Sequence, residues 1–303
     1  TSVQILCNKD LFRRFLLENG FSAPEAQAYF SPEEAIRDKA NFDYPIIIKP
    51  VDSSGSKGVT VLDSGSNIEK ALNFAFSFSR CHRIIVEHYI QKKHPYLVGG
   101  DIFVKDGKIV LWGLLNCHRD RRVNPFVPVG KSYPLQLEPS DILKIKGTLS
   151  LLVEKLRIQN GPMNVELVID KDNKVWPIDI GPRSGGNMIP DLLGDMFGVN
   201  IAKMSIEAAM GKTFECNSNE PKGFYATHNL HSDKNGLYKD ILFSEEIEPF
   251  IYRKCLYKKR GDVVEYFDNA SKCLGIVFFK FPDESTMTYT LEHIDELITI
   301  ELL

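Results

Sequence analysis

The sequence has no Cys-x-x-Cys pair, although six cysteines are scattered along its 303 residues. This spacing argues against a zinc site or a disulfide framework and favours a reducing, cytoplasmic compartment. No apolar run approaches the ~20 residues that a membrane-spanning helix needs, and no signal peptide is visible. The net charge of −3 gives no reason to expect a nucleic acid or an anionic membrane as partner. Small molecules are therefore the expected ligands.

A loop rich in serine and glycine is the most informative segment that is present. An apolar run over 44–48 ends at Lys49, the loop follows, and 59–62 has an extended pattern again. This pattern predicts a strand, a loop and a second strand. Glycines let backbone N–H groups close around an anion, and lysines add positive charge. A nucleoside triphosphate is the expected ligand, and an ordinary hairpin connection is the alternative. The candidate contacts are Lys49, Ser53, Ser54, Gly55, Ser56, Lys57 and Gly58.

Two better-known phosphate-binding loops do not match this segment. A P-loop needs Gly-x-x-x-x-Gly-Lys-Ser/Thr followed by a helix, whereas the spacing here is different and a strand follows. A protein kinase carries its lysine on the strand after the loop, whereas Lys49 precedes it. The triplet His118-Arg-Asp120 resembles a kinase catalytic loop, but the asparagine that should follow is one position early, at Asn124.

A predicted hairpin places two acids face to face. Asp172-Asn173 suits a two-residue turn, which sets Glu166 directly opposite Asp179. Alternation then puts one set of side chains on the core face: Val165, Leu167, Ile169, Trp176, Ile178 and Ile180. Facing carboxylates repel each other, and sharing Mg²⁺ with substrate phosphates would relieve that repulsion. A solvated sheet face, or a different register, is the alternative. Arg183 follows the second acid and is suited to hold a carboxylate or phosphate.

Helical and extended patterns alternate irregularly, which favours an α+β fold over a doubly wound sheet. Helices are expected over 8–20, from 31, and over 67–79, 139–158, 190–211 and 288–297. Strands are expected over 83–87, 96–104, 108–116, 162–170 and 174–181, with a turn at Asp106-Gly107 and an irregular loop over 118–134. The arginines of that loop are either substrate-selecting or simply solvated.

The motifs and elements described above, taken in their order along the chain, resemble the ATP-grasp family of ligases over most of residues 1–213. The likeness is to the carboxylate–amine ligase branch, with carbamoyl-phosphate-synthetase-like domains as relatives. The family's opening Asn-Lys pair matches Asn8-Lys9, and its hinge, a Glu with an aliphatic residue three positions on, matches Val86-Glu-His-Tyr-Ile90. The resemblance implies ATP contacts from Lys9, Lys49, the glycine loop, Glu87 and Ile90, one or two Mg²⁺ ions on Glu166 and Asp179, and catalytic roles for Arg183 and Lys49.

The same resemblance implies two α+β subdomains that grip ATP between them. Residues 1–30 and 91–213 would form the large subdomain with its leading helix, 31–90 the small lid, and 214–303 a small α+β extension. The family's usual N-terminal domain is expected to be absent. The implied reaction is ADP-forming: a substrate carboxylate is activated as an acyl phosphate and attacked by an amine or another nucleophile. Homodimers are common among such enzymes, so a homodimer is one expected state.

Two departures from the family pattern leave an alternative open. The second metal acid is usually Glu, followed two residues later by Asn, whereas this chain has Asp179 and Gly181. A nucleotide-binding module without catalysis is therefore the competing hypothesis. The pair His228 and His231 has no nearby acid that the sequence allows us to place beside it, and it reads as two ordinary histidines rather than a metal site.

Overall fold

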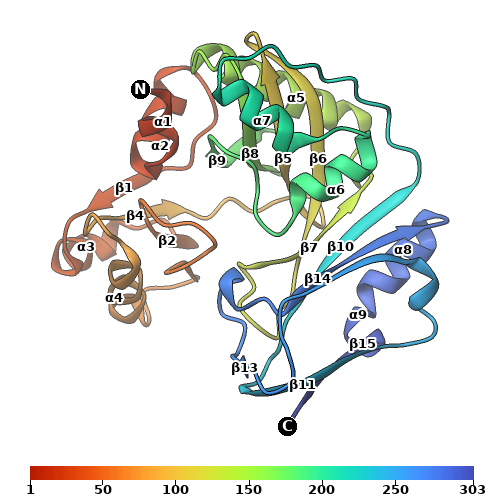
Figure 1. The fold of residues 1–303 in the computed structure, drawn as a ribbon. Helices are drawn as coiled ribbons and strands as arrows, with labels where there is room; N and C mark the ends of the chain where they lie inside the picture. The colour runs from red at the N-terminus through yellow and green to blue at the C-terminus, as the bar shows by residue number, and fades with distance from the viewer. The chain divides into compact units, whose positions relative to one another are not determined.

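The structure is a computed structural model that describes residues 1–303 (Figure 1). The chain divides into two compact units, which are described separately. Unit 1 comprises Thr1–Leu97, Ile102–Val110 and Leu137–Arg183, and unit 2 comprises Val98–Asp101, Leu111–Gln136 and Ser184–Leu303. None of the helices combines the length and the apolar character needed to cross a membrane.

Unit 1 opens with helices and then builds a four-stranded antiparallel sheet in the order β1-β4-β2-β3. Its first helices and the elements of this sheet are α1 Ser2–Leu6, α2 Lys9–Glu18, β1 Ala26–Tyr29, α3 Pro32–Asp38, the 3₁₀ turn Lys39–Asn41, β2 Ile46–Pro50, β3 Thr60–Leu62, α4 Ile68–Phe78 and β4 Ile84–His88. The predicted strand, loop and strand are confirmed as β2 and β3. Apolar side chains of α3, α4 and the sheet form one buried cluster, which includes Ile48, Leu72 and Ile84.

Local sequence signals explain where these helices begin and end. Asn8 precedes α2, and Gly20 follows it with φ of +76°, a left-handed conformation that glycine adopts without steric cost. Ser31 Oγ accepts a hydrogen bond from Glu34 N at the start of α3, although the Glu34 carboxylate returns to Phe30 N rather than to Ser31. The predicted helices at both sites are confirmed.

The rest of unit 1 is a long helix beside a hairpin. These elements are α5 Pro139–Lys155, β8 Gly161–Ile169 and β9 Val175–Gly181. Strands β5 Leu97–Lys105 and β6 Lys108–Arg119 contribute residues to both units. They turn at Asp106 and Gly107 with φ of +49° and +74°, as expected for a two-residue hairpin turn.

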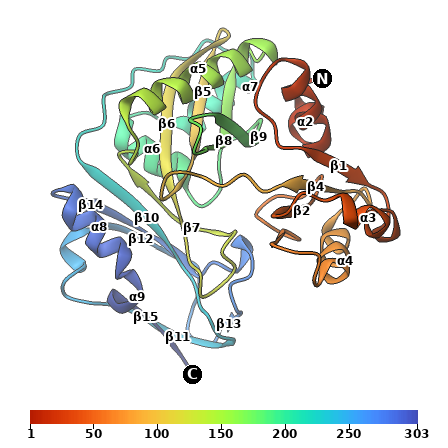
Figure 2. The same ribbon diagram turned by 180° about the vertical axis from the view of Figure 1, so that it is seen from behind.

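Unit 2 contains an antiparallel run of strands in the order β12-β14-β10-β7-β6 and a smaller sheet in the order β13-β11-β15. Its elements are β7 Pro128–Tyr133, α6 Ile189–Phe197, α7 Ile201–Ala209, β10 Phe224–Leu230, β11 Gly236–Phe243, β12 Ile251–Leu256, β13 Val263–Val264, β14 Gly275–Phe281, α8 Glu284–Glu292, α9 Ile294–Leu297 and β15 Ile298–Leu302, with 3₁₀ turns at Glu248–Phe250 and Ala270–Lys272. Figures 1 and 2 both show α8 beside β10 and β14, where a second buried cluster includes Val277, Phe279 and Met287.

The irregular loop expected over 118–134 is only partly correct. Strand β6 continues to Arg119, and Pro128–Tyr133 forms β7, which pairs with β6 on one side and β10 on the other. Lys131, within β7, is buried and donates a hydrogen bond to Cys117 Sγ at 2.6 Å.

Candidate nucleotide site

The residues predicted for the nucleotide site all belong to unit 1. Lys9 begins α2, Lys49 lies in β2, Glu87 in β4, Glu166 in β8 and Asp179 in β9. The glycine loop spans 51–59 and Arg183 follows β9. Residues scattered over most of the sequence are therefore collected in one compact part of the fold.

Lys9 joins the glycine loop to one of the two acids. Its Nζ donates a hydrogen bond of 2.9 Å to the carbonyl of Ser53 and lies 3.9 Å from Asp179 Oδ2. The Asp179 side chain is 44% exposed, so this carboxylate remains accessible to a ligand. The Lys9 ammonium group thus lies between the glycine loop, which is the candidate phosphate site, and the Asp179 carboxylate, which is a candidate cation ligand.

The facing acids are confirmed by the strand pairing. Glu166 is opposite Asp179, and Asn164 is opposite Gly181. The reasoning from the turn was nevertheless wrong, because the hairpin closes through three residues: Asp170 N donates to Lys174 O, and Asn173 adopts φ of +63°. A three-residue loop of this kind shifts the register by one.

A β-bulge restores the predicted pairing. Leu167 faces Pro177, so Ile178 is the extra residue between Leu167–Pro177 and Glu166–Asp179. The bulge also corrects the predicted core face. Pro177 is buried, whereas Trp176 and Ile178 are only partly buried. An extra residue leaves its backbone groups outside the ladder, and here Arg13 Nη2 donates 2.7 Å to the Ile178 carbonyl.

Lys49 lies in a buried ionic cluster, which we call the Lys49–Glu87–Arg13 cluster. Lys49 Nζ donates 2.7 Å to Glu87 Oε2, and Arg13 Nε donates 2.8 Å to Glu87 Oε1. Burial opposes the ionisation of Glu87, but Arg13 and Lys49 outweigh it and lower its pKa to about 2. Burial lowers the pKa of Lys49, and the attraction of the Glu87 carboxylate offsets only part of this effect.

Arg13 was missed from the sequence, although a signal for it existed. It stands four residues after Lys9, and side chains at this spacing share one face of a helix. Arginine is also the residue best suited to buried pairing with a carboxylate. A lysine and an arginine on one helical face, next to predicted acids, indicate a shared ionic network.

The glycine loop has the conformation that its composition predicts. Gly55 and Gly58 have φ of +68° and +73°, and Ser56 has φ of +59°. Gly58 is also tightly enclosed, because a Cβ there would lie 2.9 Å from Pro50 Cγ and 3.1 Å from Phe78 Cβ. A Cβ at Gly55 would meet nothing within 4 Å. Ser54 and Lys57 are exposed, as loop residues that meet a soluble ligand would be.

Gly181 leaves room for the predicted substrate arginine. A Cβ at Gly181 would lie 3.3 Å from Arg183 Cζ, so the guanidinium occupies space beside the glycine. The backbone of Arg183 is fixed at the same place, because its N–H donates to Gly181 O and its carbonyl accepts from Asn164 N, each at 2.8 Å. Gly181, which stands where the family usually has an asparagine, therefore lies directly beside the Arg183 side chain.

The residues present fit a Mg²⁺ ion that is bound together with a nucleotide. No group of three or more His, Cys, Asp or Glu side chains is arranged to hold a metal by itself. Mg²⁺ usually takes one or two carboxylates, with phosphates and water completing its octahedron. The facing carboxylates of Glu166 and Asp179 supply that donor set.

Comparison with known proteins identifies a family domain in this chain. Residues 42–191 match the family model described as the ATP-grasp domain. The chain is 24% identical over 205 residues to the carbamoyl phosphate synthase large chain of Pseudothermotoga lettingae, a match that covers 68% of this chain and only 18% of that protein. This chain thus spans about a fifth of the length of such curated relatives.

Solved structures show the same fold. The L-amino acid ligase of Bacillus licheniformis matches with a TM-score of 0.83 at 20% identity, over 100% of this chain and 74% of that chain. The biotin carboxylase domain of Hydrogenobacter thermophilus 2-oxoglutarate carboxylase, a dimer bound to MgADP, matches with a TM-score of 0.75 at 14% identity, over 98% of this chain and 67% of that chain. The chain belongs to the ATP-grasp family of ATP-dependent ligases and has its α+β fold.

Proposed function

We propose that this protein is an ADP-forming ligase that joins a carboxylate substrate to an amine. A carboxylate oxygen attacks the γ-phosphorus of ATP, ADP leaves, and the resulting acyl phosphate is attacked by the amine, which releases inorganic phosphate. The observation that supports this best is the position of Lys9, which contacts the glycine loop at Ser53 and lies 3.9 Å from Asp179.

The chain's own residues have distinct parts in this proposal. Lys9 and Lys49 offset negative charge on the transferred phosphoryl group, and preorganised charges of this kind stabilise the transition state. The backbone N–H groups between Ser53 and Gly58 hold the phosphates. Glu87 and Ile90 provide backbone contacts to adenine. Bound Mg²⁺, held by Glu166 and Asp179, would neutralise charge on the phosphate oxygens.

Arg183 would orient the carboxylate that reacts. A planar guanidinium can hold a carboxylate through two parallel hydrogen bonds, and the fixed backbone beside Gly181 defines where that fork lies. Correct orientation is worth several kcal/mol in reactions that join two substrates. Small molecules with a carboxylate and an amine are thus the substrates to test.

The experiment is phosphate release from ATP and Mg²⁺ with pairs of amino acids as carboxylate and amine donors. We expect release only when both are present, with a new amide detected by mass spectrometry. Glu166→Gln should keep nucleotide affinity but stop release, whereas Glu154→Gln, an exposed acid on α5, should change neither. Nucleotide binding without release for any pair would favour the alternative, a binding module without catalysis.

A further inference from the structure

Lys131 differs from the other buried cations of the chain because no acid neutralises it. Arg13, Lys49 and Lys131 are the buried arginine and lysine side chains, each no more than 6% exposed. Arg13 and Lys49 both pair with Glu87. Lys131 forms no ion pair, and its only hydrogen-bond partner is Cys117 Sγ. A thiol is a weak acceptor, and a buried charge without a charged partner is costly to a fold.

The strand register brings Lys131 and Cys117 together. The two residues are directly opposite each other in the antiparallel pair of β7 and β6, so their side chains leave the sheet on the same face. Lys131 is 5% exposed and Cys117 is 1% exposed. Their contact therefore follows from the backbone pairing and is shielded from solvent.

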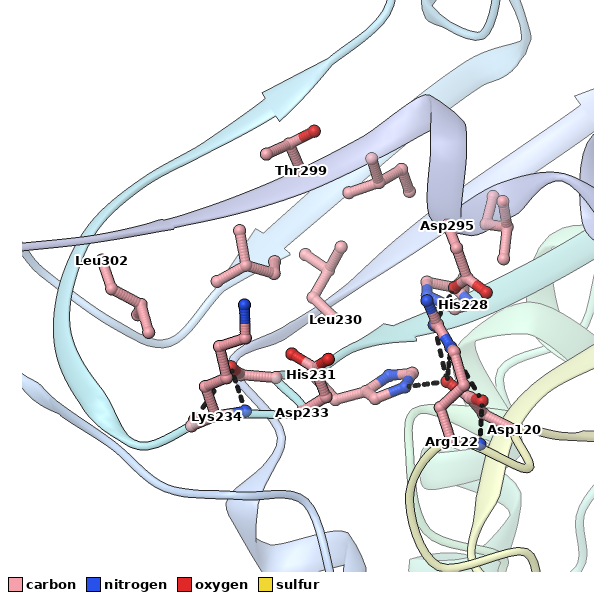
Figure 3. Close-up of a pocket in the computed structure, with 14 residues that line it drawn as sticks. Asp120, Arg122, His228, Leu230, His231, Asp233, Lys234, Asp295, Thr299 and Leu302 are labelled. Carbon is pink, nitrogen blue, oxygen red and sulfur yellow. Dashed lines mark hydrogen bonds and ion pairs between the residues drawn. The ribbon is translucent and has the colours of Figure 1, made fainter.

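The opposite face of β10 borders a pocket that contains paired acids (Figure 3). His228 lines this pocket and occupies the β10 position next to the partner of Lys131, and neighbouring side chains of a strand point to opposite faces. Within the pocket Arg122 forms ion pairs with Asp120 and Asp295. These two acids are therefore engaged elsewhere and offer no counter-charge to Lys131.

His118 reports the same uncompensated charge. Burial, followed by the positive charges of Lys131 and Arg119, lowers the pKa of His118 to about 3. No carboxylate opposes these effects. The middle of this sheet thus holds a buried positive charge without a matching acid.

The separation between the two side-chain atoms is smaller than an ordinary contact. Lys131 Nζ and Cys117 Sγ are 2.6 Å apart, whereas N–H···O hydrogen bonds measure about 2.7–3.2 Å and oxygen is smaller than sulfur. An oxygen atom bonded to both nitrogen and sulfur would hold them at about this separation. We propose that Cys117 and Lys131 form a modification site, at which dioxygen converts the pair into a covalent S–O–N bridge.

The bridge accounts for both observations at this site. It holds nitrogen and sulfur close together, and it replaces a buried ammonium group by a neutral one, which removes the cost of burying an unpaired charge. Both residues belong to unit 2. The proposal is therefore independent of the reaction at the nucleotide site.

The oxidation balances with dioxygen as the oxidant. One oxygen atom becomes bonded to both Sγ and Nζ, and the other leaves as water. The S–H bond and an N–H bond break, and their hydrogen atoms form that water, while the ammonium group releases one further proton to solvent. Sulfur and nitrogen each lose two electrons, which together reduce both oxygen atoms. Thiol reductants return these electrons and restore the free side chains, as they do for other reversible cysteine oxidation products.

The test is mass spectrometry of the full chain after storage in air-saturated buffer without reductant. The protein is unfolded in acid, its free thiols are alkylated, and it is digested with trypsin. Trypsin cannot cleave at a modified lysine, so we expect peptide 109–119 linked to peptide 123–144. The linked mass should exceed the sum of the two peptides by one oxygen atom less two hydrogen atoms, about 14 Da. Dithiothreitol added to the unfolded protein should separate them.

Variants assign the link to these two side chains. Cys117→Ser and Lys131→Met should each abolish the linked peptide. Cys273→Ser is the matched control, because Cys273 is also buried but contacts the Gly275 carbonyl rather than a lysine, and this variant should retain the link. Only unlinked peptides from air-exposed wild type, a linked mass without the added oxygen, or a link that persists in Cys117→Ser would overturn the proposal.

Discussion

Arg13 and Glu87 are joined by two hydrogen bonds, from Nε to Oε1 at 2.8 Å and from Nη2 to Oε2 at 3.4 Å, although each residue is only 2% exposed. The same Nη2 reaches the carbonyl of Ile178, the residue before Asp179. Arg13 therefore links β4, which pairs with the strand of Lys49, to β9, which carries the candidate metal ligand Asp179.

Replacing Arg13 by leucine should lower the free energy of unfolding by about 3–5 kcal/mol, because the change leaves a buried carboxylate short of one cation and the Ile178 carbonyl without a donor. Arg13→Lys should restore part of this loss, since it keeps the charge but not the two-pronged contact. Urea denaturation of the intact chain measures both.

A surface pair provides the control for the Arg13 variants. Lys203 and Glu207 are 3.8 Å apart on α7, and the lysine side chain is 69% exposed. Lys203→Ala should cost no more than about 0.5 kcal/mol. A loss below about 1 kcal/mol for Arg13→Leu would mean that the buried cluster contributes no more than a surface pair.

The stability should depend on pH through Glu87. Its pKa of about 2 in the fold is below the value of about 4.3 for an unfolded chain. A depressed carboxylate pKa stabilises the fold above the unfolded value, and this contribution is lost as the pH falls through the folded value. The window is therefore from about pH 4.3 down to about pH 2, with about 3 kcal/mol of unfolding free energy at stake.

Comparison with Glu87→Gln isolates this residue from other acids. We expect wild type to be the more stable protein at pH 6, and the gap in unfolding free energy to narrow by about 3 kcal/mol as the pH approaches 2. Denaturant titrations at a series of pH values provide the two curves. Parallel curves across the window would show that Glu87 ionises as freely in the fold as in the unfolded chain.

The glycine loop offers a matched pair of substitutions. Gly55 and Gly58 both have positive φ, so alanine at either position costs about 1–2 kcal/mol of backbone strain. Only Gly58→Ala adds a contact, at 2.9 Å to Pro50 Cγ, and overpacking of this kind costs about 1–3 kcal/mol more. Thermal unfolding of the two variants should rank Gly58→Ala clearly below Gly55→Ala, and equal midpoints would contradict the close approach.

Lys49 should be required for nucleotide binding. In Lys49→Ala the rise in melting temperature caused by ATP and Mg²⁺ should disappear, because truncating a buried, hydrogen-bonded cation costs about 2–5 kcal/mol of binding. Using the rise rather than the melting temperature itself cancels any loss of stability in the free protein. Lys70→Ala, at an exposed position on α4, should show the full rise. An unchanged rise in Lys49→Ala would remove this lysine from the site.

Much of unit 1 could be predicted because its signals are local. Asn8 and Gly20 mark the two ends of α2, and Ser31 marks the start of α3. The dipeptide Asp106-Gly107 forms the turn that joins β5 to β6. The facing of Glu166 and Asp179 was also predicted, but through two errors that cancel: a three-residue loop shifts the register, and the bulge at Ile178 shifts it back. Pro177 was the available signal, since proline in a sheet favours bulges and edge strands.

The features that could not be predicted depend on distant pairing. Strand β7 contains Pro128 and follows an arginine-rich segment, and it forms because β6 and β10 lie on either side of it. Lys131 of β7 pairs with Thr227 of β10, which lies far along the chain. Similarly, the fold brings Asp120 to His231 and Asp295 to Arg122, contacts that no local pattern encodes.

Helix α2 carries Lys9 and Arg13 on successive turns of one face, and it is anchored by the buried Phe12 and Leu16. One residue inserted or deleted between them would rotate one side chain away from its partners, since each position turns a helix by about 100°. The spacing of four is thus required for both side chains to reach their partners. The candidate phosphate contact of Lys9 and the buried pairing of Arg13 therefore depend on one and the same helical turn.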